Sequence, residues 1–214
     1  MEQNHWFAER SKLFAKYANH MPRKADVFEL VLDKVDVGWI DMHFKVNGEE
    51  TLMINASSVY EPFEDIRDWL EQIVTHVSSA YEVRINDETY DYYLIYEPVR
   101  FLYGESKYLH PNNKEYGLFY VYDGSVKQIV SDALIDSRKF IRSFYTAIIE
   151  YGKQWQQDPD FIEYWVWDAY NSEMHDYDED SPELKEFFLK KVRSEAVEKY
   201  LVDKRKINSF VRLG

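Results

Sequence analysis

The chain has 214 residues, no cysteine and a formal net charge of −13. The absence of cysteine excludes disulfides, thiolate nucleophiles, iron–sulfur clusters and cysteine-based zinc sites. The negative charge disfavours binding to nucleic acid or to an anionic membrane, which both depend on Lys and Arg, and favours basic partners through electrostatic steering. An apolar fraction of 45% suffices for a sizeable core, so we expect a single domain over residues 1–214.

The first third of the chain predicts a helix, a three-stranded antiparallel unit and a second helix. The first helix spans 4–19 and the second spans 62–77, where apolar residues recur at helical spacing. Between them, apolar and polar residues alternate, and Asn47-Gly48 is a strong hairpin signal. The predicted strands are 27–35, 38–46 and 50–57.

The rest of the chain predicts a second run of strands followed by helices. The strands are separated by Asn-Asp, Pro and Asp-Gly punctuation, and they span 80–86, 89–97, 100–104, 117–123 and 126–134. Apolar stripes predict three final helices, at 136–155, 161–171 and 182–204.

Strands in blocks joined by tight turns, with helices between and after the blocks, are typical of an α+β fold with a mainly antiparallel sheet. We expect about seven or eight strands and a helical C-terminal region from about residue 136. The chain shows no apolar signal region and no apolar run long enough to cross a membrane, so a cytoplasmic location is expected.

Signatures of catalysis are absent: there is no Gly-rich dinucleotide motif, no Walker A motif, no G-x-S-x-G and no H-E-x-x-H. The sequence therefore predicts no cofactor and favours a non-enzymatic role. His43 lies on the predicted outer face of its strand with Asp41 and Lys45, where a surface position is favoured over a general base held by Asp41.

A tyrosine-rich strand, "TYDYYLIYE", gives one alternative site for a small molecule or carbohydrate, or for weak hydrolysis. Its residues are Tyr90, Tyr92, Tyr93 and Glu97. The competing interpretation is that the rings pack against helices and loops and that Glu97 is a solvent-facing strand end. A purely structural or homo-oligomeric role is a further alternative.

The acidic window, residues 154–184, contains ten acids and no Lys or Arg, and a basic C-terminal segment follows it. Asp176, Asp178 and Asp180 alternate as in an EF-hand loop, but Ser181 and Phe187 stand where that loop needs Gly and a bidentate Glu. The EF-hand interpretation fails, and no metal site is predicted.

Two interpretations of the acidic window remain open: the basic C-terminal helix neutralises it, or it is left open for a basic partner. In the second, aromatic side chains are the anchors and carboxylates supply steering. The candidate partner-binding residues are Trp167, Asp168, Tyr170, Glu173, Asp176, Tyr177, Asp178, Glu179 and Asp180. The leading hypothesis is a bacterial-type protein-binding module, by analogy with immunity proteins that neutralise toxins.

Overall fold

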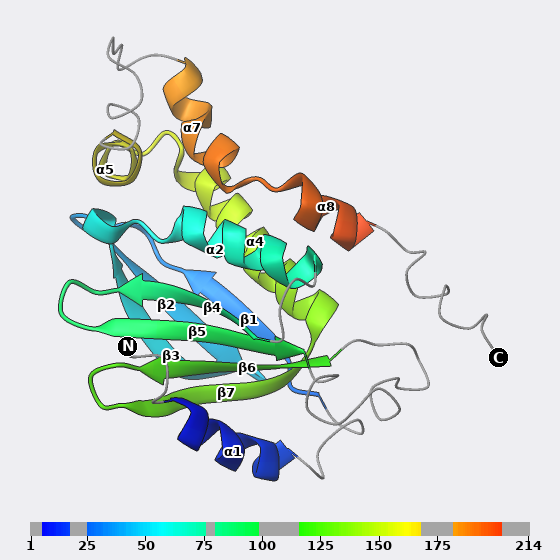
Figure 1. The fold of residues 1–214 in the computed structure, drawn as a ribbon. Helices are drawn as coiled ribbons and strands as arrows, with labels where there is room; N and C mark the ends of the chain where they lie inside the picture. The colour runs from blue at the N-terminus through cyan, green and yellow to red at the C-terminus, as the bar shows by residue number, and fades with distance from the viewer. Residues whose placement is uncertain (1–5, 18–24, 76–79, 99–115, 168–181, 203–214) are drawn as a thin grey trace.

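A computed structural model describes residues 6–17, 25–75, 80–98, 116–167 and 182–202. It confirms the α+β class, with helices packed on two antiparallel sheets (Figure 1). The predicted strand at 100–104 lies outside the described residues. None of the described helices is both long and apolar enough to span a bilayer.

The first sheet contains three strands in the order β1-β2-β3, as the alternating pattern predicts. Its strands are β1 Phe28–Leu32, β2 Trp39–Val46 and β3 Glu49–Ser57. The β2–β3 connection uses Asn47 and Gly48 at φ 55° and 83°, the left-handed conformation that a two-residue hairpin requires. The register pairs His43 with Val31 on one side and Met53 on the other.

The second sheet contains four strands in the order β4-β5-β6-β7. Its strands are β4 Tyr81–Asn86, β5 Asp91–Pro98, β6 Tyr116–Asp123 and β7 Gln128–Asp136. All eight residues of β6 are buried, because this sheet is covered on both faces. Helix α1, Trp6–Tyr17, lies along β7 and buries Leu13 and Tyr17 against one face (Figure 1).

The main core lies between the two sheets and two helices, α2 Phe63–Thr75 and α4 Ser137–Trp155. Aromatic rings fill it. Phe28 of β1 contacts Phe119 of β6 at 5.0 Å and Phe140 of α4 at 4.9 Å between ring centroids. Trp69 of α2 lies edge-on to Phe144 at 5.4 Å. Because one ring cluster joins both sheets and both helices, these elements form one packed unit.

The C-terminal region differs from its prediction in two places. The helix expected at 161–171 begins earlier, as α5 Pro159–Phe161, and continues as a π-helical segment, η3 Ile162–Trp167. Asp158 sets this start, since its side chain accepts the backbone N–H groups of Asp160 and Phe161.

The prediction of a single helix at 182–204 is wrong, because the chain forms two helices there, α7 Pro182–Val192 and α8 Glu195–Val202. Ser194 separates them. Its Oγ accepts from Val197 N at 3.1 Å, and its own N–H donates to the Tyr145 hydroxyl at 2.9 Å. The break therefore depends on a tertiary hydrogen bond from α4 that helical periodicity does not reveal.

Candidate functional site

The predicted partner-binding residues lie almost entirely outside the described part of the chain. Trp167 ends η3, and the other eight, from Asp168 to Asp180, are not described. The first part of the acidic window is described, and Trp165 is buried there among Phe63 and its neighbours. The structure thus places the start of the window and leaves its acid-rich end as a prediction.

The start of the acidic window packs against the hairpin that joins β1 to β2. Lys34 Nζ of this hairpin lies 3.0 Å from an Asp158 carboxylate oxygen. Slight burial would raise the pKa of Asp158. The Lys34 ammonium and the backbone N–H groups of Asp160 and Phe161 outweigh this effect and hold that pKa below its usual value. A Cβ on Gly38 would lie 3.4 Å from the Tyr164 ring, so the two segments are in contact.

Beside this contact, the outer face of the three-stranded sheet forms what we call the acidic sheet face. It is the side of β1–β3 turned away from the main core. Its charged and titratable members are Glu29, Asp33, Asp41, His43, Lys45 and Glu50. Four carboxylates therefore surround one lysine and one histidine.

The acidic sheet face also exposes apolar side chains on both sides of His43. Val31 and Met53 flank His43 in the register, and they keep 38% and 47% of their surface exposed. Exposed apolar area together with a charged rim is the usual composition of a protein-binding surface.

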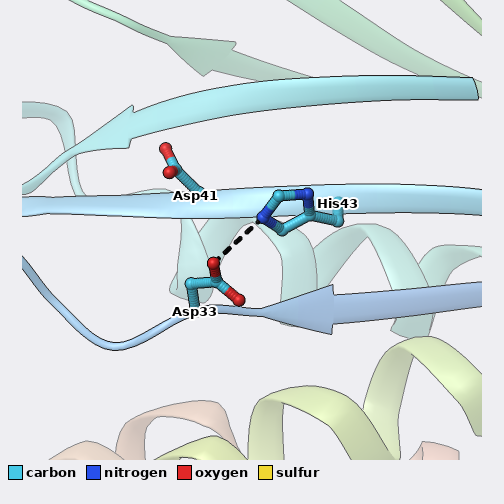
Figure 2. A group of neighbouring side chains, drawn as sticks. All are labelled: Asp33, Asp41 and His43. Atoms are coloured by element: carbon cyan, nitrogen blue, oxygen red, sulfur yellow. Dashed lines mark hydrogen bonds and ion pairs between the residues drawn. The ribbon is translucent and has the colours of Figure 1, made fainter. Parts of the chain in front are cut away.

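His43 is held by carboxylates on both sides. Its Nδ1 lies 2.8 Å from Glu50 Oε2 and its Nε2 lies 3.2 Å from Asp33 Oδ2. Figure 2 shows Asp33 reaching the ring from the end of β1, while Asp41 stands on β2 with His43. Partial burial lowers the pKa of His43, but the two carboxylates raise it more, and the net shift is upward. Its partners are thus Glu50 and Asp33, and not the Asp41 of the disfavoured general-base interpretation.

Three of these side chains also form a possible ligand set for a metal ion. Asp33, Asp41 and His43 each bring one ligand atom to within 4.8 Å of the other two. Asp41 is itself held by Asn55, whose Nδ2 donates to Asp41 Oδ1 at 2.5 Å.

A cavity of about 250 Å³ opens at the hairpin end of the acidic sheet face. It is lined by Lys34, Asp36, Trp39, Asp41 and Asn55. The hairpin that forms its wall is fixed by two backbone hydrogen bonds between Asp36 and Trp39, at 2.9 and 3.0 Å. The cavity therefore combines an aromatic ring, two carboxylates, an amide and a lysine.

Two basic side chains of α7 pair with acids outside the acidic window. Lys191 Nζ lies 3.0 Å from Glu61 and 3.3 Å from Glu64, at the start of α2. Lys190 pairs with Glu186 of its own helix. In the described ranges, no ion pair joins α7 or α8 to residues 154–167. The ring of Phe188 on α7 nevertheless packs on Phe161 of the window at 5.0 Å between centroids. Because residues 168–181 and 203–214 lie outside the described ranges, both interpretations of the window stay predictions.

The alternative tyrosine site is not brought together by the structure. Tyr92 packs against the main core, whereas Tyr93 packs on the opposite face with Tyr122, and Tyr90 is exposed at the end of the hairpin. The interpretation of Glu97 as a solvent-facing strand end is wrong, because its exposed fraction is 0%.

Glu97 instead forms a buried polar network with α1. Arg10 donates to both Glu97 carboxylate oxygens, from Nε at 2.7 Å and from Nη2 at 2.5 Å. The Tyr120 hydroxyl donates to the same carboxylate at 2.5 Å. The carboxylate is thereby engaged in attaching α1 to the sheet.

Sequence reasoning placed His43 on an outer strand face but missed Asp33 and Glu50 as its partners. The alternation of β2 revealed the face, while the pairing of β1 and β3 with β2, which brings the partners together, requires the register. Comparison with protein-family models, with curated proteins and with solved structures finds no significant match to this chain.

Proposed function

We propose that this protein is a non-enzymatic binding protein that recognises a basic protein through a continuous acidic surface. That surface consists of the acidic sheet face and the start of the acidic window beside it, and the contribution of the acid-rich end of the window, residues 168–181, is a prediction from the sequence. The observation that carries the proposal is the contact between the start of the window and the β1–β2 hairpin at the end of the acidic sheet face, where Lys34 reaches Asp158 and Gly38 packs on Tyr164. The start of the window thus lies next to the strands that form this face.

The surface has the features that such recognition needs. Carboxylates on the rim attract a positively charged partner and increase the rate of encounter. The exposed Val31 and Met53 supply apolar area beside His43, and burial of such area on binding contributes to affinity. The aromatic Trp39 at the edge adds a ring on which an arginine side chain of the partner can stack.

An immunity-like role, in which the bound partner is a basic toxin, is the specific form of this proposal. It rests on charge complementarity together with the general type of the chain. The cytoplasmic location expected from the sequence belongs to the same proposal, and fractionation of the native host tests it.

Capture from native host lysate tests the function. The baits are the wild type, the sheet-face variant Asp33→Asn/Asp41→Asn/Glu50→Gln and a helix control, Glu150→Gln/Glu186→Gln/Glu195→Gln. Both variants lose three negative charges, but the control changes exposed residues of α4, α7 and α8. EDTA is present throughout, so that bound metal plays no part.

We expect the wild type and the helix control to retain the same basic protein, and the sheet-face variant to bind it at least tenfold more weakly by calorimetry. Equal affinity of all three chains for the partner would contradict the proposal. So would a partner without an excess of Lys and Arg.

A further inference from the structure

We propose that Asp33, Asp41 and His43 form a binding site for one divalent transition-metal ion. The site is independent of the partner-binding proposal, because it needs no second protein. Within the described ranges, no other three carboxylate or histidine side chains bring their ligand atoms as close together.

The spacing of the ligand atoms suits a shared ion. Ligands about 2.1 Å from one ion and at right angles to each other are about 3 Å apart. The distance from His43 Nε2 to Asp33 Oδ2 is 3.2 Å, which already matches. Asp41 stands two residues before His43 on β2, so both side chains are on the same face, and Asp33 N donates to Asp41 O at 3.1 Å. The backbone of two paired strands thus supports all three ligands.

Side chains outside the ligand set orient the ligands. When His43 Nδ1–H donates a hydrogen bond to Glu50 Oε2 at 2.8 Å, the Nε2 lone pair of the neutral ring points at the Asp33 carboxylate. A lone pair facing a carboxylate is repulsive unless a positive charge lies between them, and either a proton or a metal ion supplies it. Asn55 orients Asp41 in the same way from β3. This carboxylate–histidine arrangement is the usual outer shell of protein metal sites.

The donor atoms select the class of ion. One imidazole nitrogen and two carboxylate oxygens suit Zn²⁺ or Mn²⁺, whereas Ca²⁺ and Mg²⁺ prefer oxygen alone. Three protein ligands leave further coordination positions for water. Asp41 also lines the cavity that contains Trp39, so those positions adjoin open space.

The test is titration of the full chain, stripped of metal with a chelator and dialysed, with Zn²⁺ and with Mn²⁺. Calorimetry measures Zn²⁺, and loss of the free Mn²⁺ resonance in electron paramagnetic spectra counts bound Mn²⁺. The variants are His43→Gln for a ligand, Glu50→Gln for the outer shell, and Asp176→Asn/Asp178→Asn/Asp180→Asn as an acidic control. Circular dichroism verifies that each variant is folded.

We expect one ion per chain, at least tenfold weaker binding in both His43→Gln and Glu50→Gln, and unchanged binding in the control. Bound Mn²⁺ should broaden the backbone amide signals of Val31, His43 and Met53, which surround the site. Millimolar Mg²⁺ should not displace the ion.

The proposal is overturned if no saturable site is found or if His43→Gln binds as tightly as the wild type. Loss of binding in the control alone would also overturn it, because that result would place the ion at residues 176–180. None of these outcomes bears on capture of a basic protein in EDTA.

Discussion

Removal of Arg10 should destabilise the fold through the buried carboxylate that it leaves behind. Glu97 has no exposed surface, and Arg10 contacts both of its oxygens. Loss of one member of a buried ion pair costs about 3–5 kcal/mol, because the remaining charge stays desolvated. The Arg10 side chain keeps 26% exposure, so we expect Arg10→Ala to fall near the lower end, at about 3 kcal/mol.

Urea unfolding followed by circular dichroism and by tryptophan fluorescence measures this loss. With an m-value of about 2 kcal/mol/M, the midpoint should fall by roughly 1.5 M. Adding Glu97→Gln to Arg10→Ala should recover about 1 kcal/mol, since a neutral amide costs less to bury than a carboxylate.

Arg84→Ala is the matched control for this prediction. Arg84 also pairs with a carboxylate on the same sheet, that of Asp91 at 2.6 Å, but its side chain is 58% exposed. Exposed pairs contribute at most about 1 kcal/mol, so its midpoint should fall by less than about 0.5 M. Equal losses in Arg10→Ala and Arg84→Ala would refute the reasoning that α1 is attached through a buried charge.

Three further predictions concern stability. Val37 has a φ of 44° in the β1–β2 hairpin, a conformation that asparagine tolerates and that strains a β-branched residue. Val37→Asn should therefore raise the free energy of unfolding, measured in urea, by about 1 kcal/mol. A loss of stability would contradict this. Gly152→Ala should cost about 1–3 kcal/mol, since the added Cβ would lie 2.6 Å from the Phe188 ring; a gain would show that α7 is not packed there. Burial is the main cause that raises the pKa of Tyr145 to about 12. The hydrogen bond from the Ser194 N–H opposes this shift, and the Glu198 carboxylate adds to it. Because the folded pKa is above the unfolded value near 10, this contribution to stability is complete below pH 10 and is lost as pH rises towards 12. Tyr145→Phe should therefore flatten the fall of stability between pH 10 and 12, and an unchanged slope would contradict the assignment.

The elements that could be predicted from the sequence are those set by local patterns. Alternation in β2 and the Asn47-Gly48 turn specify a hairpin with His43 on its outer face, and the structure has that hairpin. The apolar stripe of α2 likewise predicts its buried face.

The features that the sequence does not predict depend on residues distant along the chain. Glu97 becomes buried because Arg10, 87 residues earlier, supplies its counter-charge. The helix is interrupted at Ser194 because the Ser194 N–H donates to the hydroxyl of Tyr145, which belongs to α4. The site follows the same rule, since Asp33 and Glu50 meet His43 only through strand register.

Carboxylate footprinting of the complex tests the central claim most directly. Carbodiimide coupling of glycine ethyl ester, read by mass spectrometry, measures the reactivity of each carboxylate with and without the captured basic protein. The account predicts that Asp33, Asp41 and Glu50 lose reactivity several-fold on binding, while Glu150 and Glu186 on the helices stay unchanged. Protection of the helix carboxylates with full reactivity of the acidic sheet face would contradict it.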